Sequence, residues 1–97
     1  MKKLKAAEIV LDFGLYLRKN FDAANVASIV SAMGAGVEMP AVVIDRASKR
    51  CVDGFHRVQA AIQLHGDDAE IQVIEKDYPS EKEMFLDAMR YNARAKK

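Results

Sequence analysis

The segment Val52-Asp53-Gly54-Phe55-His56-Arg57 joins two different patterns, and this junction decides the fold. The residues before Gly54 favour a strand. After it, apolar residues recur at spacings of about three and four up to Gly66, which is typical of a helix. A glycine lets the backbone turn sharply between the two elements. The segment therefore predicts a strand, a tight turn and a helix, and one face of that helix carries Val58, Ala61, Ile62 and His65.

Upstream of this turn the sequence predicts a hairpin and, before it, a helix. Residues 41–44 form a β-branched run after Pro40, residues 45–49 are polar, and residues 50–52 return as a second strand. Asp22 can cap the earlier helix, which glycines 34 and 36 end. Its apolar stripe is Val26, Ile29, Val30 and Met33. Residues 7–11 are expected to form a short first strand.

Downstream, residues 70–76 alternate as a strand, and Ser80 with Glu83 has the spacing of a capping box at the start of a final helix. The expected apolar stripe of that helix is Phe85, Ala88 and Met89. The order strand, helix, hairpin, helix, strand, helix predicts an α/β (α+β) fold. It comprises a small mixed β-sheet packed with three to four helices.

The chain has 97 residues, a formal net charge of +1 and a single cysteine, Cys51. This length fits one domain over residues 1–97, and no repeat or Pro/Gly/Ser-rich linker divides it. We see no signal peptide and no apolar run long enough to span a membrane, so a cytoplasmic protein is expected. One cysteine excludes an intramolecular disulfide. The final helix reaches basic Lys97 without a stop signal, which leaves a C-terminal truncation open.

The turn at residues 53–57 has the chemistry of an anion site. N–H groups at a helix start and the helix dipole attract negative charge. Arg57 adds a guanidinium fork for phosphate oxygens, and His56 adds a donor or a proton-transfer group. The structural alternative is a plain connection that uses glycine for its geometry. Asn92 continues the stripe of the last helix, either as a helix end in solvent or as a ligand or metal contact facing the cleft of Arg57.

From about Leu11 to Arg94, the chain resembles the ParB N-terminal domain of the ParB/sulfiredoxin superfamily, often labelled "ParB-like nuclease". The matching features, in order, are Arg18 in an early loop, a helix ending in glycines before Pro40, the Gly54-x-x-Arg57 box, and Asn92 on a final helix. The resemblance implies a nucleotide or phosphate pocket. Gly54, Phe55, His56 and Arg57 would contact the ligand, with Arg18 as a second arm.

The resemblance also implies cofactors and partners. The ligand would be a nucleotide (CTP, ATP or ADP), with magnesium near Asn92. Tyr91 stands where ParB proteins usually have a glutamate, which weakens a magnesium site. Phe55 and Tyr91 are either stacking surfaces for a base or packing residues. Phe55 also stands where the sulfiredoxin branch has its reactive cysteine, which argues against that chemistry, and Cys51 is expected to be buried.

Two function classes remain open. The first is a regulatory or DNA-associated module that binds a nucleotide, with DNA contacted through a domain outside this chain. The alternative is a small enzyme of the same fold: a free amino-acid kinase, a nucleotide hydrolase or a nuclease. It would use Asp53 and His56 as catalytic residues, because free serine kinases share the Asp53-Gly54-Phe55-His56-Arg57 box, and Glu38 could supply a second carboxylate. Asp53 could instead cap the helix. No clustered carboxylates support two-metal cleavage by a nuclease.

Overall fold

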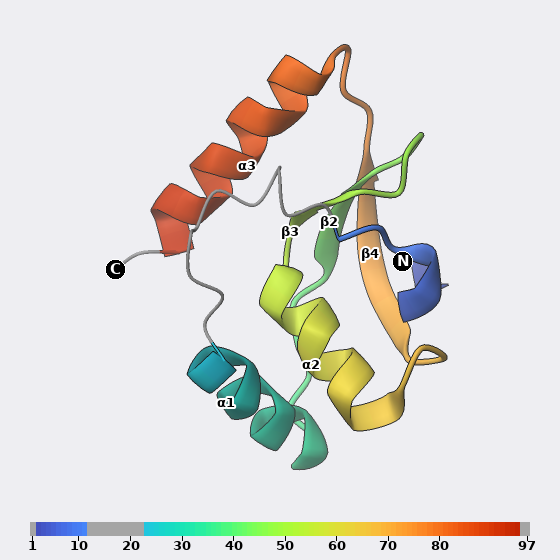
Figure 1. The fold of residues 1–97 in the computed structure, drawn as a ribbon, viewed down its shortest axis with the longest axis vertical. Coiled ribbons are helices and arrows are strands. Elements are labelled where there is room, and N and C mark those ends of the chain that lie inside the picture. The colour runs from blue at the N-terminus through green and yellow to red at the C-terminus, as the bar shows by residue number, and fades with distance from the viewer. Residues whose placement is uncertain (1, 12–22, 96–97) are drawn as a thin grey trace.

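The computed structural model describes residues 2–11 and 23–95, with side chains up to Tyr91, and its centre is a four-stranded sheet (Figure 1). The strands are β1 (Lys2–Lys5), β2 (Val42–Asp45), β3 (Cys51–Asp53) and β4 (Glu70–Lys76). Their order across the sheet is β1-β4-β2-β3. Strands β2 and β4 are parallel, whereas the two outer pairs are antiparallel. The sheet is mixed, as the sequence predicted.

Helices cover the two faces of this sheet. They are α1 (Ala23–Gly34), α2 (Phe55–His65) and α3 (Glu81–Ala95), with a short 3-10 turn η1 (Ala6–Glu8) after β1. Helices α1 and α2 pack against each other, and α3 packs against β3 (Figure 1). Alternation along β2 sends Val42 and Ile44 into the core beneath α2, and Val43 into a smaller core beneath α3. None of the helices among residues 2–11 and 23–95 is long and apolar enough to cross a membrane.

The first strand lies elsewhere than expected. Residues 7–11 were predicted to form it, but β1 is Lys2–Lys5 and pairs with β4, and Val10 makes only an isolated bridge to Arg50. The prediction is wrong because it followed β-branched residues. Ile9 instead packs into the core after η1, whereas the lysine-rich β1 occupies a sheet edge, where charged side chains reach water.

The buried face of α3 also differs from the expected stripe. Met84 and Ala88 are buried, whereas Met89 is 44% exposed. Phe85 is half-buried beside them. The sequence pattern placed the apolar face about one residue too far toward the C-terminus. The face that is buried is the one that contacts Val43 and Val52. One of the two hydrogen bonds of the predicted capping box is present, since the Glu83 N–H donates to Ser80 Oγ at 3.3 Å.

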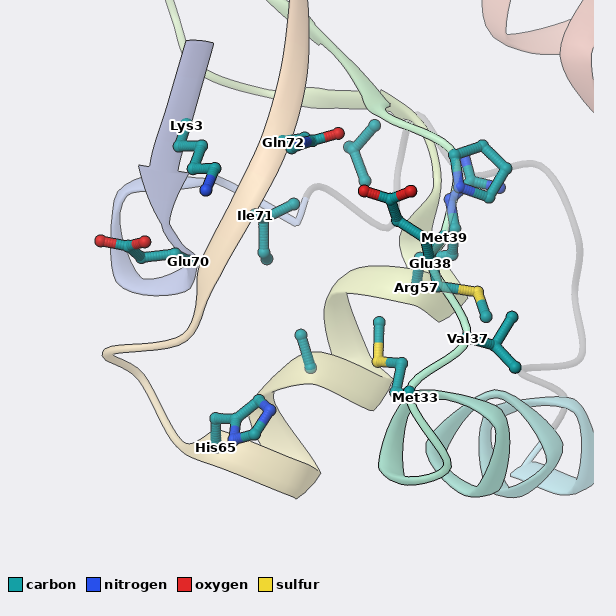
Figure 2. Close-up of a pocket in the computed structure, with 14 residues that line it drawn as sticks. Lys3, Met33, Val37, Glu38, Met39, Arg57, His65, Glu70, Ile71 and Gln72 are labelled. Carbon is teal, nitrogen blue, oxygen red and sulfur yellow. The ribbon is translucent and has the colours of Figure 1, made fainter. Parts of the chain in front are cut away.

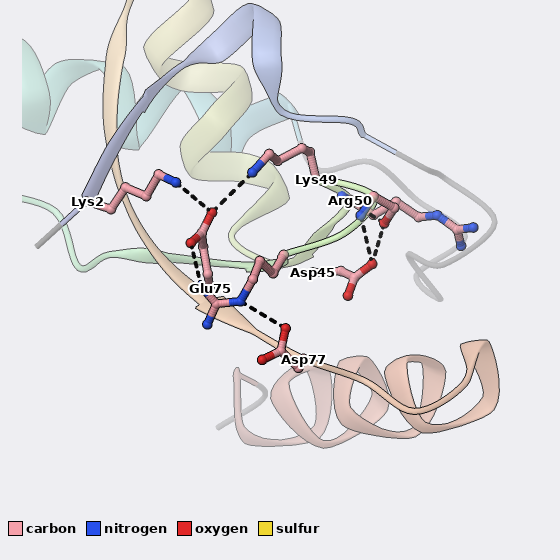
Figure 3. Close-up of polar contacts among 8 residues, drawn as sticks. Lys2, Asp45, Lys49, Arg50, Glu75 and Asp77 are labelled. Atoms are coloured by element: carbon pink, nitrogen blue, oxygen red, sulfur yellow. Dashed lines mark hydrogen bonds and ion pairs between the residues drawn. The ribbon is translucent and has the colours of Figure 1, made fainter.

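Glu75, near the end of the inner strand β4, ties β4 to β1 and to the hairpin turn after β2 (Figure 3). Its carboxylate pairs with Lys2 at 3.1 Å, Arg46 at 3.0 Å and Lys49 at 3.2 Å. Lys2 belongs to β1, and the other two belong to the hairpin turn after β2. Hydrogen bonds from Lys2 and Lys49 lower the pKa of the Glu75 carboxyl from its ordinary value. The cluster therefore anchors the hairpin that leads into β3.

Candidate functional site

Gly54 connects β3 to α2 in a conformation that requires glycine. Its φ is 114°, in the left-handed region. A Cβ at this position would lie 2.8 Å from Val42 Cγ2 and 3.1 Å from Arg57 Nη2. Any side chain would therefore collide with the strand and with the guanidinium beside it. The glycine of the predicted turn is needed both for its backbone angle and for close packing.

Arg57 lies in the first turns of α2, and its guanidinium is poorly satisfied within the protein. Its Nη2 contacts Ala41 O and Asp53 Oδ2, each at 3.4 Å, near the limit of a hydrogen bond. Its Nε is buried and has no hydrogen-bond partner among the described residues. A guanidinium carries five N–H donors, and a buried donor without an acceptor costs free energy. Arg57 is therefore prepared for an acceptor that the described residues do not supply.

Asp53 pairs with Arg57 and does not cap the N-terminus of α2. The pair forms across one helical turn, with side chains 32% and 22% exposed for Asp53 and Arg57. The residue that caps α2 is Gly54, and no side chain makes a capping hydrogen bond there. The capping interpretation of Asp53 is therefore wrong. Its carboxylate faces the cation that any phosphate would also approach.

A pocket of about 490 Å³ opens beside Arg57 (Figure 2). It lies between the segment before β2 and the first residues of β4, with α2 forming another wall. The wall is apolar where the end of α1 and residues 37, 39 and 40 contribute. Its polar side chains are Lys3, Glu38, Arg57, His65, Glu70 and Gln72. A volume of this size is in the range of small-molecule sites.

The structure brings together only part of the predicted site. Arg57 and Glu38 line the pocket, whereas the other members of the box do not. The Phe55 ring is 4% exposed in the main core, so it packs and offers no stacking surface. His56 is half-buried near the start of α2. Arg18 and the side chain of Asn92 lie outside the described part of the chain.

Four polar residues of the pocket were not predicted as site residues: Lys3, His65, Glu70 and Gln72. His65 was assigned to the apolar face of α2, yet it is exposed at the pocket wall. Glu70 and Gln72 alternate on one face of β4, beside Lys5 and Lys3 of the paired strand. The alternation of side chains along β4 places Glu70 and Gln72 on one face, and this could be read from the sequence. That this face borders the pocket could not, because it depends on the pairing of β4 with β1.

Comparison with solved structures identifies the arrangement. The chain matches a Pnob8-like ParB-N domain, solved in a C2221 crystal form, with a TM-score of 0.66 and 13% sequence identity. The fold is that of a ParB-N domain. The match covers 84% of this chain and 31% of that chain, so the protein spans less than a third of its neighbour's length. No protein-family model and no curated protein matches the sequence.

Magnesium near Asn92 stays a prediction of the sequence resemblance, because the side chain of Asn92 lies outside the described part of the chain. Residues 2–11 and 23–95 contain no group of three His, Cys, Asp or Glu side chains that could hold a metal. Tyr91, in the position of the family's glutamate, accepts a 3.4 Å hydrogen bond from Lys76, whose ammonium lies 5.5 Å from its ring centroid. The ammonium of Lys76 therefore lies beside Tyr91.

The single cysteine has a packing role. Cys51 lies on β3 with 0% exposure, in the core beneath α2. Burial, and secondarily the negative charge of Asp53, raises the pKa of its thiol above the ordinary value. A buried thiol that resists ionisation is a poor nucleophile. The expectation that Cys51 is buried is confirmed.

Proposed function

We propose that this ParB-like domain binds a nucleotide or a related phosphate-bearing ligand, with the phosphate at Arg57 and the rest of the molecule in the adjoining pocket. One observation carries the proposal: the buried Nε of Arg57 has no acceptor among the described residues, on the wall of a pocket large enough for a ligand. A phosphate oxygen would supply that acceptor, and guanidinium groups bind phosphates through paired donors.

The surrounding turn supports the same role. Arg57 projects from the first turns of α2, where the helix dipole favours an anion. Gly54 brings the helix start against Val42, a residue of the pocket wall. His56 directly precedes Arg57 and would add a second donor. The phosphate would therefore meet a positive end of the helix and a fixed cation together.

The proposal favours binding over turnover. Asp53, the candidate catalytic carboxylate, is paired with Arg57 and does not line the pocket. A module whose occupancy regulates another protein or domain fits this arrangement better than a kinase or hydrolase. Association with DNA stays a prediction of the sequence resemblance. The alternative enzyme is tested by the same samples, since nucleotide turnover abolished in Asp53→Ala would favour it.

Calorimetric titration of the purified chain with CTP, ATP, ADP and GTP, with and without magnesium, tests the proposal. We expect at least one nucleotide to bind, and Arg57→Ala to weaken that binding by about tenfold or more, because a charged hydrogen-bond donor is removed. Arg46→Ala is the matched control, since this exposed arginine pairs with Glu75 and Asp77 outside the pocket. The proposal is wrong if none of these nucleotides binds, or if Arg57→Ala binds them as tightly as the intact protein does.

A further inference from the structure

The pocket beside Arg57 contains polar side chains that have no side-chain partner among the described residues. Five of them make no side-chain hydrogen bond or ion pair with another residue in the described part of the chain. These are Lys3, Glu38, His65, Glu70 and Gln72. In contrast, the carboxylates outside the pocket at Glu75 and Asp87 are fully engaged by cations or hydroxyl groups. The available groups therefore gather where a ligand would lie.

Glu38 is the pocket carboxylate on the segment that separates α1 from β2. Figure 2 shows its side chain directed into the pocket, which Gln72 also lines. It forms no ion pair with Arg57, although both residues line the same space. A ligand can therefore contact the cation with one end and the carboxylate with the other.

We propose that Glu38 makes this site selective for guanine nucleotides, an inference that rests on the proposed function. A carboxylate offers two acceptor oxygens and no donor at neutral pH. The Watson–Crick edge of guanine presents two adjacent donors, the ring N1–H and the 2-amino group, which match those two oxygens. Adenine, cytosine and uracil each place an acceptor beside a donor on that edge, so one carboxylate oxygen would face a lone pair.

The apolar wall suits the faces of such a base. Met33, Val37 and Met39 line the pocket next to Glu38 (Figure 2). Thioether and aliphatic side chains adapt to flat apolar surfaces, and such walls with a few polar groups that fix orientation are usual in ligand sites. The base would lie against this wall, with Glu38 reading its edge and Arg57 holding the phosphate.

Titration with GTP and ITP tests the inference, because the two nucleotides differ only in the 2-amino group. We expect the intact protein to bind GTP about tenfold or more tightly than ITP, since the charged acceptor loses one donor. It should also bind GTP more tightly than ATP or CTP. In Glu38→Gln the preference for GTP over ITP should fall to within about twofold, because the amide offers one acceptor oxygen.

Glu81→Gln is the matched control, since it makes the same change at an exposed carboxylate that pairs with Arg50 outside the pocket and should keep the preference for GTP. Equal affinities for GTP and ITP in the intact protein, or a preference that survives Glu38→Gln, overturn this inference alone. Tighter binding of CTP or ATP than of GTP overturns it as well. Absence of binding by every nucleotide overturns both the inference and the proposed function.

Discussion

Asp53 Oδ2 lies 3.4 Å from Arg57 Nη2, so the carboxylate that ends β3 holds the cation that begins α2. In the proposed site, Asp53 competes with the phosphate for this guanidinium. Asp53→Asn should therefore tighten nucleotide binding by about threefold, the scale of a partly exposed ion pair. Calorimetry on Asp53→Asn measures it. Asp77→Asn, which removes the same charge beside Arg46, should leave affinity unchanged. Weaker binding in Asp53→Asn would mean that Asp53 positions Arg57.

Gly54→Ala should destabilise the domain more than glycine replacement elsewhere. Both Gly54 and Gly66 have positive φ, at 114° and 80°, but only at Gly54 would a Cβ collide with Val42. We expect Gly66→Ala to cost about 1 kcal/mol from backbone strain, and Gly54→Ala to cost about 1–3 kcal/mol more from overpacking. Urea unfolding of both variants gives the difference. Equal losses would show that the strand and helix can move apart at little cost.

Glu75 should contribute stability that depends on pH. Its folded-state pKa is lowered from the ordinary value of 4.5, first by the hydrogen bonds from Lys2 and Lys49. A lowered pKa means that the contribution is present above the unfolded-state value and disappears as the pH falls through the folded-state value. The intact protein should therefore exceed Glu75→Gln in stability at pH 7, and the difference should shrink as the pH falls below the ordinary carboxyl value of 4.5.

Thermal or urea unfolding of the intact protein and Glu75→Gln between pH 3 and 7 measures this convergence. Glu81→Gln is the control, because its carboxylate pairs with Arg50 alone among the described contacts and its side chain is 77% exposed. Its difference from the intact protein should be small at every pH. A gap for Glu75→Gln that stays constant down to pH 3 would contradict the prediction.

The Tyr78 hydroxyl donates to Asp87 Oδ2 at 2.5 Å and fastens α3 to the segment after β4. Partial burial raises the pKa of the Asp87 carboxyl, but the hydrogen bonds from Tyr78 and Lys76 outweigh it and leave that pKa below its ordinary value. Tyr78→Phe should lower the free energy of unfolding by about 1 kcal/mol, since a charged acceptor loses one donor.

Tyr91→Phe provides the comparison for Tyr78→Phe. Its hydroxyl accepts a hydrogen bond from Lys76 at 3.4 Å, near the outer limit of hydrogen-bond distance, and the substitution keeps the aromatic ring that faces the ammonium. In urea unfolding, Tyr91→Phe should lower the free energy of unfolding less than Tyr78→Phe does. The reverse ranking would show that Lys76 and Tyr91, rather than Asp87, hold α3 in place.

The parts of the site that could be predicted are local in sequence. The Gly54 turn and the Arg57 that follows it were found because a strand pattern changes to a helix pattern at one glycine. The pocket could not be predicted, because its polar residues come from β1, the segment before β2, α2 and β4. Glu38 was noted only as a second carboxylate. Arg18 and the side chain of Asn92 remain predictions.

By itself, the sequence determined α2, the β2–β3 hairpin and β4, since apolar periodicity and turn residues act over a few neighbouring positions. The tertiary structure alone decided that β1 is Lys2–Lys5, because that strand gains its hydrogen bonds from β4, far along the chain. It also decided the surroundings of Arg57. Among the described residues, its guanidinium contacts Asp53, which is only four residues away in sequence, and Ala41 O on the segment before β2, which only folding brings to α2.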